Sequence, residues 1–214
     1  MKLKLSPEDL QNQDDFELLT EVSHQNLREF VLEQVAARNT IIRIYSIYQI
    51  LMVLLFTYFF TRAIILAIKG GYEMIIFVAA GIVFSLSLLI IIHELIHALG
   101  YLITGARKIS FGAIPKKFVF YAMADRQVIA PGAFYIVALA PLVLVKLACL
   151  AGIIFYFDHH LIYFFLTVMC LHSLFCAGDT AMLAFYQKHK GKEIYNYDDK
   201  NKGKTYFYCR KSRT

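Results

Sequence analysis

The sequence predicts a mainly α-helical membrane protein, with about four transmembrane helices and a small cytoplasmic β-hairpin between the second and the third. Of its 214 residues, 58% are hydrophobic and only 18% are charged, and the mean hydropathy is +0.54. A soluble globular domain is ordinarily less apolar and more highly charged. Residues 74–92 carry no charged side chain, and about 20 mostly apolar residues cross a bilayer core of roughly 30 Å. These values indicate an integral membrane protein.

The first part of the chain, residues 1–40, is polar and is interpreted as a cytoplasmic helical cap. Ser6 followed by Pro7 and two acidic residues is typical of a helix N-terminus. Apolar residues recur at helical spacing over 27–35, a stripe that would lie on the membrane or pack against the rest of the protein. We expect no signal peptide, because no basic start with a short apolar core and a small-residue cleavage site is present.

Four apolar segments are long enough to cross a membrane, and together they make residues 41–186 one membrane domain. They cover residues 44–67, 74–103, 131–157 and 161–186. The connection at 107–126 holds five Lys or Arg, more than the other connections between spans. Because positive residues favour the cytoplasmic side, this connection and both termini are predicted to be cytoplasmic. The expected location is the plasma membrane of a prokaryote, and no oligomeric state is predicted.

Two segments outside the spans have their own patterns. Residues 108–123 cluster β-favouring side chains around Ile114 and Pro115, which predicts a β-hairpin. The hairpin would be purely structural, or its edge would hold an extended peptide by main-chain hydrogen bonds. Residues 187–214 hold nine Lys or Arg against three acids and are interpreted as a basic cytoplasmic tail that suits anionic lipid headgroups. We expect no nucleic-acid partner, because no nucleic-acid module is recognisable. The four cysteines show no paired spacing and are predicted to be free thiols.

The chemistry of the chain is concentrated in the second span, where His93, Glu94 and His97 form the pattern H-E-x-x-H. On a helix the two histidines lie one turn apart on the same face, so both imidazoles can reach one zinc ion. Glu94 would act as the general base for a water molecule that zinc activates. A charged side chain at the centre of a span costs roughly 2.5 to 3.5 kcal/mol, which a bound cation would offset. The alternative is a pair of histidines satisfied by neighbouring helices, with Glu94 protonated.

A catalytic zinc site has three protein ligands and an open position, so a third ligand is expected from another span. Asp179 in the fourth span is the candidate. Its predicted depth matches that of His97, because the second and fourth spans run parallel to each other. A soluble zincin that uses Glu193 or Asp198 of the C-terminal segment as third ligand is a lesser alternative, and the apolar run before His93 argues against it.

Two further polar residues lie within predicted spans and are possible accessory residues of the site. His172 lies seven residues before Asp179, two turns away on the same helix face. It would orient the metal site, contact the substrate or only pack between helices. Lys146 in the third span would stabilise an oxyanion or pair with an acid.

On these residues the chain resembles the site-2 protease group of intramembrane zinc metalloproteases, and within that group the membrane proteins called putative zincin peptidases. The resemblance covers residues 74–186 and rests on the HELIH motif, the β-like insert and the run CAGD that ends at Asp179. It implies that His93, His97 and Asp179 bind zinc, that Glu94 is the base, and that the substrate is a membrane-embedded or membrane-adjacent peptide. The site-2 group typically has Asn and prolines before Leu-Asp-Gly, whereas this chain reads HSLFCAGD.

The leading hypothesis is a zinc-dependent intramembrane or membrane-associated endopeptidase that hydrolyses peptide bonds near the cytoplasmic face. The alternative is a non-proteolytic membrane protein with a structural or transport-related metal site. Replacement of Glu94 discriminates between them, since a structural site needs the ligands and not the base. A transporter normally has polar residues along several spans, whereas this chain concentrates them at one depth.

Overall fold

A computed structural model describes residues 5–37, 39–114 and 119–211 of the chain. The chain divides into two compact units. Unit 1 comprises Met1–Ile42, Glu94–Ala140 and Gly178–Thr214, and unit 2 comprises Arg43–His93 and Pro141–Ala177.

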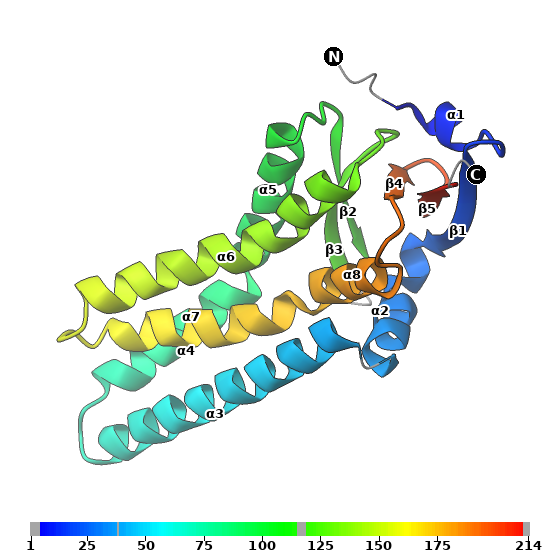
Figure 1. Ribbon diagram of the computed structural model, residues 1–214. Helices are drawn as coiled ribbons and strands as arrows, with labels where there is room; N and C mark the ends of the chain where they lie inside the picture. Colours follow the sequence, from blue (N-terminus) through cyan, green and yellow to red (C-terminus); the bar gives the residue numbers. More distant parts are fainter. Residues whose placement is uncertain (1–4, 38, 115–118, 212–214) are drawn as a thin grey trace. The chain divides into compact units, whose positions relative to one another are not determined.

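The chain begins with α1 and β1, continues through two runs of helices separated by the strand pair β2 and β3, and ends with β4 and β5 (Figure 1). The helices are α1 (Pro7–Leu10), α2 (Leu27–Ala36), α3 (Thr40–Ile68), α4 (Glu73–Leu86), α5 (Leu88–Ile103), α6 (Pro131–Phe155), α7 (Ile162–Phe175) and α8 (Ala177–Lys188), with a short 3-10 helix η1 at His24–Asn26. The strands are β1 (Phe16–Ser23), β2 (Ile109–Ile114), β3 (Val119–Ala124), β4 (Ile194–Asp199) and β5 (Lys204–Arg210).

The long apolar helices agree with the predicted membrane protein class. Helices α3 and α6 are each long and apolar enough to cross a membrane, with hydropathies of 2.2 and 2.5. The pairs α4 with α5 and α7 with α8 meet the same criterion only together, because each helix alone is too short, and the pairs are bent by 47° and 44°. The described residues therefore contain two candidate spans, or up to four if each bent pair is one span.

The sequence predicted two of these spans as uninterrupted helices, and this is wrong at Ser87 and Cys176. Ser87 Oγ donates to the Val83 carbonyl over 2.6 Å, and its backbone has left the helical region at φ −124° and ψ −88°. Cys176 Sγ donates to the His172 carbonyl over 3.4 Å, again four residues back. Such side chains compete for the carbonyls of the helix and bend it.

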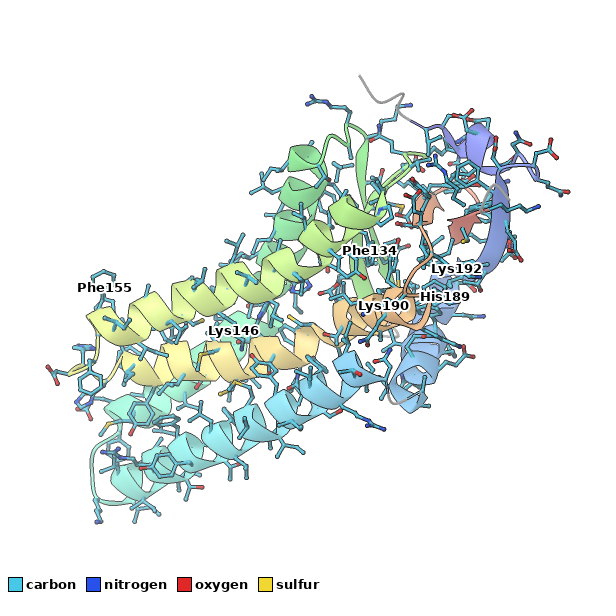
Figure 2. All side chains as sticks on the ribbon, in the orientation of Figure 1. Phe134, Lys146, Phe155, His189, Lys190 and Lys192 are labelled. Carbon is cyan, nitrogen blue, oxygen red and sulfur yellow. The ribbon has the colours of Figure 1, made fainter. Side chains whose placement is uncertain are left out.

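Unit 2 is held together by close packing of α4 on α7. A Cβ atom added at Gly81 would lie only 2.8 Å from the Cβ of Thr167, so the two helices meet where a side chain is absent. Next to this contact, Ala63, Val78 and Tyr163 form a buried cluster. Outward-facing apolar side chains cover the helices, such as Phe155 at the end of α6, which is 83% exposed (Figure 2). Such a surface suits contact with lipid.

Unit 1 contains the predicted β-hairpin. Strands β2 and β3 pair antiparallel, from Ile109 opposite Ala124 to Ile114 opposite Val119, which confirms the hairpin expected from the β-favouring residues. The residues expected at its turn, 115–118, lie outside the described part of the chain.

A second sheet in unit 1 joins the two ends of the chain, and the sequence did not predict it. Its strand order is β1-β5-β4, with both pairs antiparallel. The helix start at Ser6 is confirmed, since Ser6 Oγ accepts from the Asp9 amide over 3.2 Å. However, residues 16–23 of the expected helical cap form β1, and the expected basic tail contains β4 and β5.

The core of unit 1 packs this sheet against α2, α5, α6 and α8. Phe207 on β5 is fully buried, with its ring centroid 4.8 Å from that of Phe185 on α8. The other buried core residues are Val22, Phe30, Tyr101, Ala106, Ala124, Ile129, Phe134, Val137, Ala138, Leu183, Tyr186 and Ile194. Because α5, α6 and α8 share this core, it fixes the three helices that carry His97, Val137 and Asp179.

Candidate metal centre

Helix α5 presents the H-E-x-x-H motif on its buried side. His93 and His97 are 6% and 7% exposed, whereas Leu95 and Leu99 are 53% and 50% exposed. Glu94 is partly buried between these two faces. The helix is continuous from Leu88 to Ile103, so the two histidines lie one turn apart, with Cβ atoms about 5–6 Å from each other.

His97 faces Asp179 within unit 1. Its Nε2 lies 3.1 Å from Asp179 Oδ1, at the first turn of α8, and its Nδ1 lies 3.0 Å from the Val137 carbonyl on α6. A carbonyl only accepts, so Nδ1 carries the proton and donates. In a neutral imidazole the lone pair of Nε2 then faces the carboxylate oxygen. Two acceptors at this distance require a cation between them, either a proton or a metal ion.

The local sequence explains why the Val137 carbonyl is available to His97. Pro141 lies four residues further along α6, inside the helix. Proline has no N–H, so it cannot make the helical hydrogen bond to Val137, and its ring pushes that carbonyl aside. Gly100 brings the two helices together, because a Cβ atom there would lie 3.3 Å from the Val137 Cα. Thus one proline and one glycine place an acceptor beside His97.

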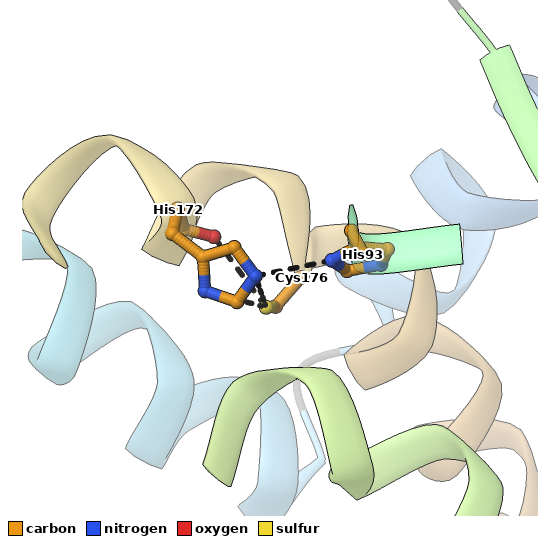
Figure 3. A group of neighbouring side chains, drawn as sticks. All are labelled: His93, His172 and Cys176. Carbon is orange, nitrogen blue, oxygen red and sulfur yellow. Dashed lines mark hydrogen bonds between the residues drawn. The ribbon is translucent and has the colours of Figure 1, made fainter. Parts of the chain in front are cut away.

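His93 is held in a similar way within unit 2. Its Nδ1 lies 3.1 Å from Nε2 of His172 on α7, and His172 is fully buried. When Nδ1 of His93 donates to His172, Nε2 of His93 is the nitrogen with a lone pair, as in His97. The Sγ atom of Cys176 lies 3.8 and 3.9 Å from the two ring nitrogens of His172 (Figure 3).

The donor set suits zinc. Two imidazoles and a carboxylate are among the ligands that Zn²⁺ prefers, and three protein ligands leave a position for a reactant. Ligating histidines commonly donate their second ring nitrogen to a carbonyl or another acceptor, which fixes the orientation of the ring. His97 has such a partner in Val137, and His93 has one in His172.

The comparison with known families bears on this arrangement. A family model described as putative zincin peptidase matches residues 85–195, which include the H-E-x-x-H motif and Asp179. The chain belongs to the putative zincin peptidase family. The predicted resemblance to zincin peptidases is thereby confirmed, and the family supports a metallopeptidase that uses zinc. The wider relation to the site-2 protease group stays a prediction. No curated protein matches the chain, and no solved structure does.

The accessory residues of this zincin peptidase lie in places that the sequence did not fully predict. His172 and Asp179 were expected on one helix face, but the break at Cys176 puts them on separate helices, α7 and α8. Lys146 was expected to stabilise an oxyanion or to pair with an acid. Its ammonium donates to the Met169 carbonyl and lies 5.4 Å from the centroid of the Tyr48 ring. Figure 2 labels Lys146 on α6. Its role as an accessory residue stays a prediction.

The lesser alternatives for a third ligand have other contacts. Glu193 lies 3.2 Å from Arg210 on the exposed surface, and Asp198 accepts a hydrogen bond of 2.6 Å from Thr205. Asp179 therefore remains the zincin peptidase residue best placed to complete the set with His97.

Sequence reasoning missed two contributors to the candidate centre. Cys176 lies four residues after His172, a spacing at which two helical side chains can meet, so the sequence contained this signal. The Val137 carbonyl belongs to the main chain, and its only sequence signal is the proline four residues later.

Proposed function

We propose that this zincin peptidase is an H-E-x-x-H endopeptidase that hydrolyses membrane-embedded or membrane-adjacent peptides near the cytoplasmic face. The observation that carries the proposal is the pair formed by His97 and Asp179. Nε2 and Oδ1 face each other over 3.1 Å, while the second nitrogen of the same ring is engaged by Val137. This arrangement suits a divalent cation and is adjacent to Glu94, the acid of the motif.

His93, His97 and Asp179 would hold the zinc ion. When bound, zinc would supply a Lewis acid that polarises the peptide carbonyl and makes water a better nucleophile near neutral pH. The carboxylate of Asp179 offsets part of the charge of the cation, which lowers the cost of placing the ion in an apolar region.

Glu94 would carry the proton through the reaction. Its carboxylate accepts a proton from the attacking water, and the resulting acid delivers that proton to the nitrogen of the leaving amine. The hydrogen bond from Nδ1 to Val137 keeps the ring of His97 in one orientation. His172 does the same for His93. Such contacts leave less reorganisation for the moment of reaction.

The membrane setting of the proposal follows from the apolar helices and the distribution of charge. Four spans, with each bent helix pair as one span, would put the basic connection and both termini in the cytoplasm, in the plasma membrane of a prokaryote. The lipid bilayer would then surround α3, of whose most apolar stretch only 6% is buried. The edge of the hairpin β2–β3 would bind an extended segment of the peptide substrate.

The proposal is tested on the full chain purified in detergent, with zinc measured by metal analysis and cleavage measured on fluorescein-labelled casein. Glu94→Gln should keep about one zinc per chain and lower cleavage by about 10²- to 10⁴-fold, the usual contribution of a general base. Asp179→Ala should lower zinc occupancy. Glu193→Ala is the matched control, because it also removes a carboxylate and should change neither quantity.

Two results would contradict the proposal. Full zinc occupancy after Asp179→Ala would exclude that residue as a ligand. Undiminished cleavage by Glu94→Gln would exclude the base. A structural metal site behaves differently from both, since it needs the three ligands but is indifferent to Glu94→Gln in every measurement.

A further inference from the structure

We propose a second metal position in unit 2, formed by His93, His172 and Cys176, that takes a thiophilic ion such as Cd²⁺ or excess Zn²⁺. Each of these residues offers one ligand atom, and the three atoms lie within 4.8 Å of one another. Figure 3 shows the three side chains directed toward a common region. Binding at this position does not depend on the proposed function, but its consequence for activity does.

The distances are close to those that a tetrahedral metal site requires. Zn–N distances of about 2.0–2.1 Å and a Zn–S distance of about 2.3 Å place two nitrogen ligands about 3.3 Å apart, and a nitrogen and a sulfur ligand about 3.6 Å apart. The structure has 3.1 Å between His93 Nδ1 and His172 Nε2, and 3.9 Å between His172 Nε2 and Cys176 Sγ. These two separations are therefore within a few tenths of an ångström of those in a tetrahedral site, and the third, between the ligand atoms of His93 and Cys176, is at most 4.8 Å.

The donor chemistry separates this position from the first one. A thiolate with two imidazoles is softer than two imidazoles with a carboxylate, so it favours thiophilic ions. Binding replaces the proton of the Cys176 thiol, which is released to the solvent, while each histidine coordinates as a neutral imidazole through one nitrogen. No bond is oxidised or reduced in this exchange.

The local fold favours a cation at this place. Helix α7 ends at Phe175, so its last carbonyls lie next to Cys176 and present the negative end of the helix dipole. The break in the helix occurs at Cys176 itself, whose thiol is turned back toward the carbonyl of His172. His172 is fully buried and Cys176 is 1% exposed. The other buried cysteines of unit 2, Cys149 and Cys170, belong to no such group among the described residues.

The two positions would compete, because His93 belongs to both. A neutral imidazole has one lone pair, so His93 can serve only one ion unless the ring loses its second proton. An ion bound with His172 and Cys176 would therefore take His93 away from the ion held with His97 and Asp179. Excess metal should inhibit the peptidase by this route.

Cadmium titration of the full chain in detergent tests the site without any measurement of activity. Wild type should develop a thiolate-to-cadmium charge-transfer band in the near ultraviolet. Cys176→Ser should lose this band completely, and His172→Ala should weaken cadmium binding about tenfold or more. Cys170→Ser is the matched control and should keep the band. Asp179→Ala should also keep it, because that residue belongs only to the first position.

A band that survives Cys176→Ser would overturn the proposal, as would the absence of a band in wild type. Circular dichroism establishes that each variant is folded, and Cys176→Ala provides a second variant if the serine is not tolerated. The consequence for activity is measured as the ratio of cleavage at excess zinc to cleavage at one equivalent. This ratio should be several-fold higher in Cys176→Ser than in wild type. If no variant cleaves, the proposed function fails while the cadmium band still decides the second position.

Discussion

Replacement of Pro141 by alanine should make helix α6 more stable and the metal centre weaker. Pro141 lies inside α6, where proline costs about 3 kcal/mol relative to alanine. Alanine restores an N–H group that can bond the Val137 carbonyl, which at present accepts from Nδ1 of His97 over 3.0 Å. The helical N–H then competes with His97 for that carbonyl.

The expected magnitude follows from the role of such contacts in metal sites. Loss of the partner that orients a ligating histidine typically lowers metal affinity about 10- to 100-fold, which is about 1.4 to 2.7 kcal/mol. The carbonyl has two lone pairs and can accept two hydrogen bonds, so the lower end of this range is expected. The midpoint of thermal unfolding should rise in the same variant, because the helix gains a hydrogen bond.

The assay is competition for zinc between the purified chain and a chromophoric chelator, combined with thermal unfolding. Pro131→Ala is the matched control. Pro131 is the first residue of α6, where a missing N–H costs nothing, so neither zinc affinity nor the unfolding midpoint should change appreciably. If Pro141→Ala unfolds at a higher temperature yet binds zinc as tightly as wild type, the link from proline to carbonyl to imidazole is refuted.

Three further predictions concern the stability of the two units. Phe207→Ala should cost about 3–5 kcal/mol, because the side chain is fully buried, whereas Phe111→Ala, at a 50% exposed site, should cost less than about 0.5 kcal/mol in the same urea titration. Gly81→Ala should destabilise by about 1–3 kcal/mol, since its Cβ would lie 2.8 Å from a threonine side chain of α7, while Gly132→Ala, with nothing within 4 Å, should be neutral or stabilising. Burial and neighbouring tyrosines raise the pKa of Tyr208 to about 12. Its contribution to stability is therefore fully present below pH 10 and is lost as the pH rises to about 12, so Tyr208→Phe should flatten the fall of the unfolding midpoint over that range.

The sequence predicted the elements whose signals are local. The apolar segments gave the membrane class, the HELIH run gave the two imidazoles on one helix, and the β-favouring residues around Ile114 gave the hairpin β2–β3. None of the four cysteines, all of them described, forms a disulfide bond, as expected from their spacing. Each of these patterns is contained in a stretch short enough to be interpreted without knowledge of the rest of the chain.

The sheet that joins the two ends of the chain could not be predicted in this way. Phe16 on β1 lies opposite Arg210 on β5. A pairing between segments so far apart in the chain cannot be recognised from the residue pattern of either segment alone. The net charge of residues 187–214 likewise carries no information about which of its side chains are buried in a sheet. Lys200 and Lys202 lie at the turn between β4 and β5 and are exposed, whereas residues 205–209 of β5 are buried.

The H-E-x-x-H motif supplies two imidazoles one turn apart, but it does not determine which nitrogen of each ring carries a proton. In this protein the answer comes from other helices, from the Val137 carbonyl for His97 and from His172 for His93. When both partners accept a hydrogen bond from Nδ1, each ring presents Nε2 as the nitrogen with a lone pair. The partner of His97 is a backbone carbonyl, which only accepts a hydrogen bond and has no proton to exchange. The partner of His93 is His172, an imidazole that can itself bind a metal ion, and Cys176 lies beside it. The two histidines of the motif therefore differ in their partners, since only His93 has neighbours that can bind a second ion. Inhibition by excess metal should arise at His93 and not at His97.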